Sequence, residues 1–416
     1  MGWDVYSNIQ RLCLQPTASS IQQLKSHLSE FGTLSLIANE HNIYSASSSL
    51  SADDHSGYQH AWLRDNVMIA YSKWFCGNRE SALRTTRSLQ NFLVNQLRHF
   101  QDIIEAPALK EDISRRPRVR FNAHTLEELS GEWANAQNDA LGAVIWLRFL
   151  MANEDAPETP SRLTEEECTL YQHILRYLEA IQYWSDHDSG AWEETRKLNT
   201  SSVGAVLAGL KQIMRYGEQC AQPETLALTK LADKLYKIGL PVLARLPFES
   251  PPNRRADAAL LFLIFPFAIV NDAEVQDQIL SLVRARLMGS FGIRRYIGDS
   301  YYCQNYDEWF SPASRTADFS RNIEFRDELL VPGHEAQWCL FDPILSTIYG
   351  LRSGKSRDLQ ILHFQRSIRQ LTKDLCCPEL YYSKNGRYIP NHHTPLAWTQ
   401  ANLAIALHLL EGTISL

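Results

Sequence analysis

The chain has 416 residues, a formal net charge of −6, and a composition of 44% hydrophobic and 21% charged residues. This composition is typical of a globular protein, and the negative charge argues against a broad nucleic-acid-binding surface. The start of the chain lacks the layout of a secretion signal, and the longest apolar stretch, residues 258–270, contains Pro266 and is too short to span a bilayer. We therefore expect a cytoplasmic protein that binds neither nucleic acid nor a membrane.

Helical periodicity dominates the chain. Cap residues mark several helix ends. Thr164 and Glu167 form a capping box at the start of one helix. Gly217 is placed where a second helix ends, and Pro223 is placed where the next one begins. Apolar residues at helical spacing predict about twelve helices, near residues 20–31, 64–76, 79–99, 137–152, 164–181, 199–217, 223–238, 256–265, 273–288, 336–350, 355–373 and 396–411.

The predicted helices follow one another in sequential pairs, without βαβ alternation. This order favours an all-α array of helical hairpins. Residues 256–264 are apolar nearly all round, as the inner helices of a closed array would be. No linker or low-complexity segment divides the chain. We therefore predict a single domain over residues 1–416, in which residues 1–57 form a helical or irregular N-terminal extension.

Two long segments, residues 100–135 and 290–333, resist assignment to helices. Both are rich in Arg, Asn, Asp, Tyr and Trp. Because long connections in a compact domain are usually functional, we expect them at the rim of a pocket for a polar ligand. The basic run from Arg115 to Arg120 is broken by Pro117, and we expect it to lie on the loop surface.

The cysteines and histidines give no sign of a metal site. The eight cysteines include no Cys-x-x-Cys pair, which favours free, buried thiols in a reducing compartment. His392 and His393 lack a further residue at metal-ligand spacing, so we expect them to be structural or on the surface. The sequence predicts neither a metal nor a cofactor.

Two acidic segments carry the strongest chemical signal. Glu193 and Glu194 follow Trp192, and Glu379 precedes Tyr381 and Tyr382. Hydrolysis of a glycosidic bond requires two flanking carboxylates, of which one donates a proton and the other acts as base or nucleophile. Aromatic faces stack on sugar rings. The two segments therefore suggest a sugar-hydrolysing site.

Three further clusters lie just before or between the predicted helices. The first contains Trp62, Arg64 and Asp65, whose charged groups can bind vicinal hydroxyls while the indole offers a stacking face. The others are residues 132–139 and residues 294–299. Each also has a structural interpretation, because Asp65 can stabilise a helix N-terminus, and loop arginines often form structural ion pairs. The clusters alone leave both interpretations open.

The order of these motifs resembles the family 15 glycoside hydrolases, the glucoamylases, and at least as closely the glucoamylase-like domain of phosphorylase kinase α subunits. The resemblance spans about residues 58–411. The matching segments are Trp62-Leu63-Arg64-Asp65-Asn66, Leu198-Asn199-Thr200-Ser201-Ser202-Val203-Gly204, Asp257-Ala258-Ala259-Leu260-Leu261, Arg295-Tyr296, Pro378-Glu379-Leu380-Tyr381-Tyr382 and Pro395-Leu396-Ala397-Trp398.

The resemblance implies an (α/α)6 toroid with an active site at one end of the barrel. It implies that Glu193 is the general acid and Glu379 the general base. Glu194 matches a carboxylate that contacts substrate, and no metal is required. The substrate-binding residues implied by the matching positions are Trp62, Arg64, Asp65, Trp133, Trp192, Glu194, Arg295 and Trp398.

The residues give the two glutamates different properties. The apolar Trp192 should raise the pKa of Glu193, so that a proton is available near neutrality. Glu379, near tyrosine hydroxyls, should stay ionised and draw a proton from water. Inversion at the anomeric carbon needs carboxyl groups roughly 6.5–9.5 Å apart.

Two function classes follow. The first is an inverting hydrolase that releases glucose from the non-reducing end of an α-linked di- or oligosaccharide. The second is a non-catalytic carbohydrate-binding or regulatory module. Leu380, where glucoamylases usually have Gln, favours the second class, whereas residues 395–402 look more like the hydrolases. The sequence leaves the linkage, the chain length and the oligomeric state open.

Overall fold

The computed structural model describes residues 2–14, 16–48, 56–154, 163–220, 222–252, 254–352 and 356–414, and these residues are mostly helical. The strands are short: β1 (Ala61–Trp62), β2 (Arg120–Phe121), β3 (Gln337–Trp338), β4 (Leu380–Lys384) and β5 (Arg387–Pro390). The α-helices are α1 (Gly2–Leu12), α2 (Ala18–Glu30), α3 (Leu63–Phe75), α4 (Arg79–Val94), α5 (Leu97–Glu105), α6 (Asn138–Glu154), α7 (Glu165–Ala180), α8 (Thr200–Gln219), α9 (Pro223–Gly239), α10 (Leu261–Ile264), α11 (Ala273–Leu282), α12 (Tyr306–Trp309), α13 (Ile323–Asp327), α14 (Phe341–Leu351), α15 (Arg357–Arg369) and α16 (Ala397–Ile414).

Most predicted helices are confirmed, several with their predicted ends. The capping box of Thr164 and Glu167 is present at α7, and Pro223 begins α9. The helix predicted over 256–265 is wrong in length, because α10 has a single turn and Phe265 is extended at φ −145°. A residue before proline is pushed out of the helical region, and Pro266 follows it. The sequence patterns also missed α1 and the short strands.

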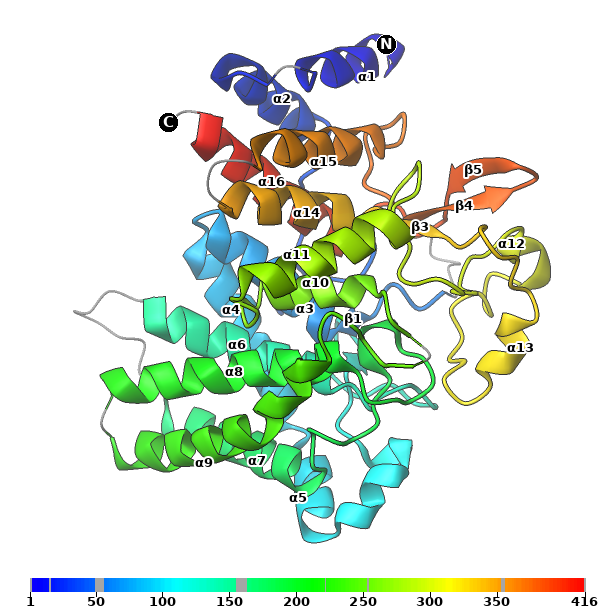
Figure 1. The fold of residues 1–416 in the computed structure, drawn as a ribbon. Helices are drawn as coiled ribbons and strands as arrows, with labels where there is room; N and C mark the ends of the chain where they lie inside the picture. The colour runs from blue at the N-terminus through cyan, green and yellow to red at the C-terminus, as the bar shows by residue number, and fades with distance from the viewer. Residues whose placement is uncertain are drawn as a thin grey trace.

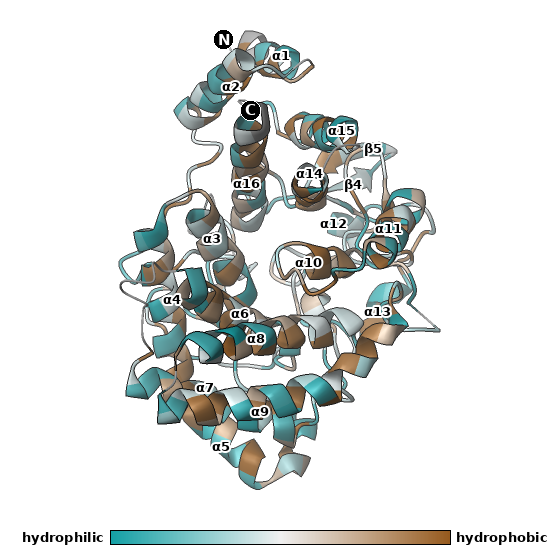
Figure 2. Cartoon of the chain, turned by 60° about the vertical axis from the view of Figure 1, so that its left-hand side comes forward, coloured by the Kyte–Doolittle hydropathy of each residue, from teal (hydrophilic) through white to brown (hydrophobic). Residues whose placement is uncertain are grey.

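The inner helices of the described structure form a closed ring (Figures 1 and 2). Neighbouring members pack against each other in the order α3, α6, α8, α10, α14 and α16, and α16 returns to α3. The outer helices α4, α9, α11 and α15 each pack against their inner partner along the chain, and α2 covers α16. This arrangement is the six-hairpin ring that the resemblance implies.

Burial follows the position of each helix in the ring. The inner helix α6 is buried along nearly its whole length, whereas α9 buries only one face. In Figure 2, α10 and α14 are mainly brown, while the outer α9 and α15 carry teal faces. The hydrophobic effect thus fixes which helices lie inside.

The N-terminal helices pack on the outside of the ring. Ile9 and Leu24, from α1 and α2, join a separate apolar cluster with Phe364 of α15 and Leu407 of α16. Residues 49–55 of the predicted extension lie outside the described residues. The division into one domain with an N-terminal extension stays a prediction.

Two further sequence expectations have outcomes in the structure. The cysteines of the chain are free, and five of them are buried. The basic run is not simply loop surface, because Arg116 is fully buried and donates both terminal nitrogens to Asp186, at 2.8 and 2.9 Å. Among the described helices, none combines the length and apolarity needed to cross a bilayer.

The contact between α6 and α8 gives a test of the ring. A Cβ atom at Gly142 would lie 2.5 Å from the Val206 nitrogen and 2.6 Å from the Ala205 carbonyl carbon, both backbone atoms. We expect Gly142→Ala to lower the free energy of unfolding by about 1–3 kcal/mol, because this overpacking outweighs the better helix propensity of alanine. Urea unfolding measures the change.

Gly412 in α16 is the matched control, since a Cβ there meets no atom within 4 Å. Gly412→Ala should leave stability unchanged or raise it by up to about 1 kcal/mol. Equal effects of the two substitutions would contradict the close approach of α6 and α8.

Candidate active site

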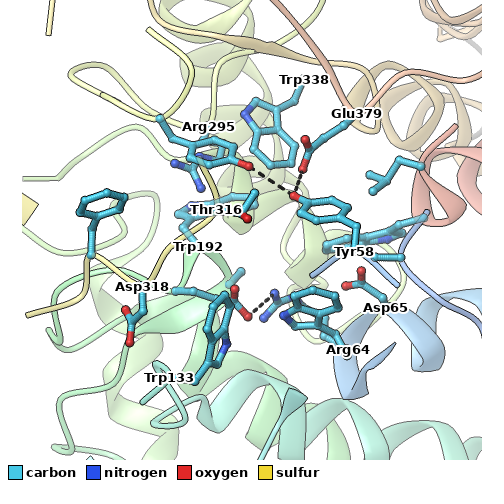
Figure 3. Close-up of a pocket in the computed structure, with 18 of the residues that line it drawn as sticks. Tyr58, Arg64, Asp65, Trp133, Trp192, Arg295, Thr316, Asp318, Trp338 and Glu379 are labelled. Atoms are coloured by element: carbon cyan, nitrogen blue, oxygen red, sulfur yellow. Dashed lines mark hydrogen bonds and ion pairs between the residues drawn. The ribbon is translucent and has the colours of Figure 1, made fainter. Parts of the chain in front are cut away.

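A cavity at one end of the ring collects residues from distant parts of the chain (Figure 3). Trp62, Arg64 and Asp65 come from β1 and the first turn of α3, while Glu379 precedes β4. All the predicted site residues line this cavity except Glu194. The full lining consists of Ala46, Tyr58, Trp62, Arg64, Asp65, Trp133, Ala191, Trp192, Glu193, Arg295, Tyr301, Thr316, Ala317, Asp318, Phe319, Arg326, Trp338, Glu379, Leu396 and Trp398.

Glu193 occupies an unusual backbone conformation. It ends the short turn Gly190–Trp192 with φ 59° and ψ 41°, in the left-handed region. Residues other than glycine occupy this region at a cost in free energy, and such residues concentrate at functional sites. The turn separates neighbouring side chains, because Glu193 lines the cavity and Glu194 does not.

The Glu193 carboxylate meets an ordered pair of polar side chains. Gln137 Nε2 donates to Glu193 Oε1 at 2.9 Å, and Gln137 Oε1 accepts from Arg64 Nη1 at 2.8 Å. Arg64 Nη2 lies 3.6 Å from Glu193 Oε1. Burial raises the pKa of Glu193, and the opposing effects of Arg64 and Gln137 are smaller. The predicted direction of this pKa shift is confirmed.

Glu379 faces a different set of neighbours. Tyr58 donates its hydroxyl to Glu379 Oε1 at 2.6 Å, and Asn391 Nδ2 donates to Oε2. His393 Nδ1 lies 3.1 Å from the same Oε2. The tyrosine hydroxyl comes from Tyr58, far away in the sequence, because the hydroxyl of Tyr381 instead donates to a backbone carbonyl.

Glu194 does not line the cavity, and the substrate contact that the resemblance implies for it stays a prediction. It is 1% exposed and pairs with Arg295 Nη2 at 3.0 Å, Arg326 Nη2 at 2.7 Å and Arg254 Nη2 at 3.1 Å. Although burial opposes ionisation, the three guanidinium groups hold the pKa of Glu194 well below its usual range. Glu194 therefore positions two arginines that line the cavity and does not itself face the ligand space.

Asp65 is a third carboxylate at the cavity. Burial raises its pKa to about 7, against the effect of the neighbouring Arg64, and the charges of Glu193 and Glu379 raise it further. Within the described part of the chain its carboxylate makes no hydrogen bond, although its side chain lines the cavity. A strongly perturbed carboxylate that is open to a cavity is typical of a functional site.

Aromatic rings and guanidinium groups form the cavity walls. Trp62 and Trp133 meet edge to face with their centroids 6.1 Å apart, and Arg64 lies 5.7 Å from the Trp398 ring centroid. Across the cavity, Arg295 lies 5.3 Å from the Trp192 centroid and 5.1 Å from that of Trp338. Such walls can stack on a sugar ring and also donate hydrogen bonds.

The structure adds lining residues that sequence patterns missed. Asp318, Phe319 and Arg326 lie in the segment 290–333 that we expected at the rim, although no motif singled them out. Tyr58 lies next to the predicted extension and carries no local signal. His393, which was expected to be structural or on the surface, is buried against Glu379. In the described residues no group of three His, Cys, Asp or Glu side chains could hold a metal ion.

The buried pairing of Glu194 gives a stability test. Glu194→Gln leaves an uncompensated charge among three arginines, and at pH 7 we expect a loss of about 3–5 kcal/mol in the free energy of unfolding. Because the pKa of Glu194 is lower in the folded state than in the unfolded state, its stabilisation is complete above the unfolded value of about 4.3 and is lost as the pH falls. Urea unfolding at pH 7 measures the first effect, and unfolding at a series of pH values from 4 downward measures the second.

Glu179 provides the control, because it pairs with Lys234 in an exposed contact. Glu179→Gln should change stability by no more than about 1 kcal/mol. A Glu194→Gln variant as stable as the wild type at pH 7 would contradict the role of this ion cluster.

Comparisons with known proteins agree with this geometry. A model of the family described as "Glycosyl hydrolases family 15" matches residues 34–308. The chain is 26% identical over 398 residues to the "Probable phosphorylase b kinase regulatory subunit alpha" of Caenorhabditis elegans, which covers 85% of this chain and 31% of that protein. The chain thus spans about a third of the length of the curated relatives it matches.

Two solved structures show the same fold. A glycosidase in complex with glucose has a TM-score of 0.64 at 17% identity, and the match covers 97% of both chains. The glucoamylase from Saccharomycopsis fibuligera has a TM-score of 0.61 at 12% identity, and the match covers 97% of this chain and 98% of that chain. The (α/α)6 toroid is therefore confirmed, and the chain belongs to glycosyl hydrolase family 15.

Proposed function

We propose that the protein is an inverting, exo-acting glycoside hydrolase that releases glucose from the non-reducing end of α-glucosides or short α-glucans. The observation that carries this proposal is the pair of carboxylates in one cavity with opposite surroundings. Burial raises the pKa of Glu193, whereas hydrogen-bond donors surround Glu379. One group is thus suited to donate a proton and the other to accept one.

The proposed reaction uses each group once. Glu193 gives its proton to the glycosidic oxygen as the bond to the anomeric carbon breaks. Water attacks that carbon from the opposite face and loses a proton to Glu379. Arg64 and Asp65 bind hydroxyl groups of the sugar being released, and Trp62 offers a stacking face. Family membership and the glucose complex of a structural neighbour support a sugar as ligand.

A second candidate is a carbohydrate-binding regulatory module with no turnover. The observation that favours it is the similarity to curated proteins named as phosphorylase b kinase regulatory subunits. Leu380, directly after Glu379, also departs from the glucoamylase pattern. Both candidates place a sugar in the cavity, so turnover distinguishes them.

The first test is a panel of maltose, isomaltose, trehalose and longer α-glucans. We expect glucose release from at least one of them, and both Glu193→Gln and Glu379→Gln should lower kcat by about two to four orders of magnitude. Coupled detection of glucose measures the rate. Saturable binding of a panel sugar without turnover would favour the regulatory module, and release that survives the loss of either glutamate would contradict the mechanism.

The second test uses two neighbours of Glu193 with opposite effects on its pKa. Gln137 lowers this pKa by a hydrogen bond, and the charge of Asp318 raises it. Gln137→Met should therefore keep Glu193 protonated to higher pH and move the alkaline limb of the kcat profile upward, while Asp318→Asn should move it downward. Shifts in the same direction, or no shift in either variant, would contradict the assignment of Glu193 as the acid.

A further inference from the structure

The surroundings of Glu379 contain a residue with no role in the reaction described so far. His393 and Glu379 are each 2% exposed, and His393 Nδ1 lies 3.1 Å from Glu379 Oε2. An ionised carboxylate only accepts hydrogen bonds, so Nδ1 must carry a proton for this contact to be a hydrogen bond. The 3.2 Å contact of Nδ1 with Asn391 Nδ2 is then not a hydrogen bond, because both nitrogens are donors. Asn391 Nδ2 donates to the same oxygen.

The two carboxylate oxygens of Glu379 differ in the number of lone pairs that are free to accept a hydrogen bond. Each carboxylate oxygen has about two lone-pair positions. Oε2 meets both Asn391 and His393, whereas among the residues that the structure describes Oε1 meets only the hydroxyl of Tyr58. This leaves Oε1 with one free lone pair that can accept a hydrogen bond from a water molecule. Glu379 lines the cavity, so such a water can come from the ligand space.

The imidazole ring also holds Tyr58. The rings of Tyr58 and His393 stack with their centroids 3.7 Å apart and an interplanar angle of 9°. A single side chain therefore contacts both Glu379 and the donor to Oε1. The segment that carries it is tied to the sheet, because the Asn391 backbone nitrogen donates to the Leu380 carbonyl at 3.1 Å.

We propose that His393 is a positioning residue of the general base, an assignment that rests on the proposed function. Its Nδ1–H fixes Oε2 and its ring fixes Tyr58, so Oε1 faces the attacking water. The water oxygen bonds to the anomeric carbon, its proton passes to Oε1, and the electron pair of the broken glycosidic bond stays on the leaving oxygen. That oxygen takes the proton of Glu193.

Two substitutions separate the hydrogen bond from the stacked ring. His393→Phe keeps a ring on Tyr58 and removes the donor, whereas His393→Asn removes the ring and places an amide near the position of Nδ1. We expect His393→Phe to lower kcat about ten- to a hundredfold, the effect of a lost hydrogen bond to a charged group. KM should stay within about twofold of the wild type, because His393 is absent from the cavity lining.

His393→Asn should retain most of the wild-type kcat, because the amide can still donate a hydrogen bond to Glu379. If the ring had only a structural role, its loss in this variant would lower kcat. His392→Phe is the matched control, since His392 is the adjacent, exposed histidine, and it should leave kcat and KM unchanged. A His393→Phe variant with wild-type kcat, or a His393→Asn variant as slow as His393→Phe, would overturn the proposal.

A measurement without turnover separates this proposal from the proposed function. In protein labelled with ¹⁵N-histidine, we expect an imidazole N–H signal that is protected from exchange, absent in His393→Asn and displaced in Glu379→Gln. If the signal is absent in the wild type, or if Glu379→Gln leaves its chemical shift unchanged, the proposed hydrogen bond between His393 and Glu379 is contradicted. If the wild type hydrolyses no sugar of the panel, the proposed function fails. The NMR measurement still shows whether His393 donates a hydrogen bond to Glu379.

Discussion

The left-handed turn at Glu193 gives two adjacent carboxylates opposite chemical environments. Glu193 enters the cavity, where burial raises its pKa. Glu194 enters a cluster of three arginines, which lowers its pKa although it is more deeply buried than Glu193. The same cluster orients Arg295 and Arg326 toward the cavity wall. One backbone conformation thus supplies both the proposed proton donor and the positive wall beside it.

The ring of helices supplies the rigidity that this turn requires. The inner helices bury apolar side chains on nearly all sides, so the segments at one end of the ring start from fixed positions. α3 begins at the cavity with Arg64 and Asp65, and α16 begins there with Trp398. The segment 290–333 contributes Arg295, Thr316 and Asp318 to the cavity lining, away from Arg64 and Asp65 (Figure 3). Helix packing therefore determines the geometry, and loops supply most of the chemical groups.

Sequence patterns predict the helices of this fold well and its irregular parts poorly. The capping box at Thr164 and the apolar faces of the long helices depend on local spacing, which a sequence displays directly. The separation of Glu194 from Glu193 depends on one φ angle and on arginines up to 132 residues away. The contacts of Tyr58 and His393 with Glu379 join segments 321 and 14 residues from it. Such contacts leave no periodic signal.

The surroundings of Glu379 bear on the difference between a hydrolase and a regulatory module. Leu380 cannot donate a hydrogen bond from its side chain, yet Glu379 has side-chain donors from Tyr58 and Asn391 and contacts His393. The leucine therefore does not leave the proposed base without polar partners.

The anomeric form of the first sugar released tests the proposed inverting mechanism most directly. ¹H NMR during early turnover of an α-linked substrate should show β-glucose, and α-glucose as the first product would contradict the account.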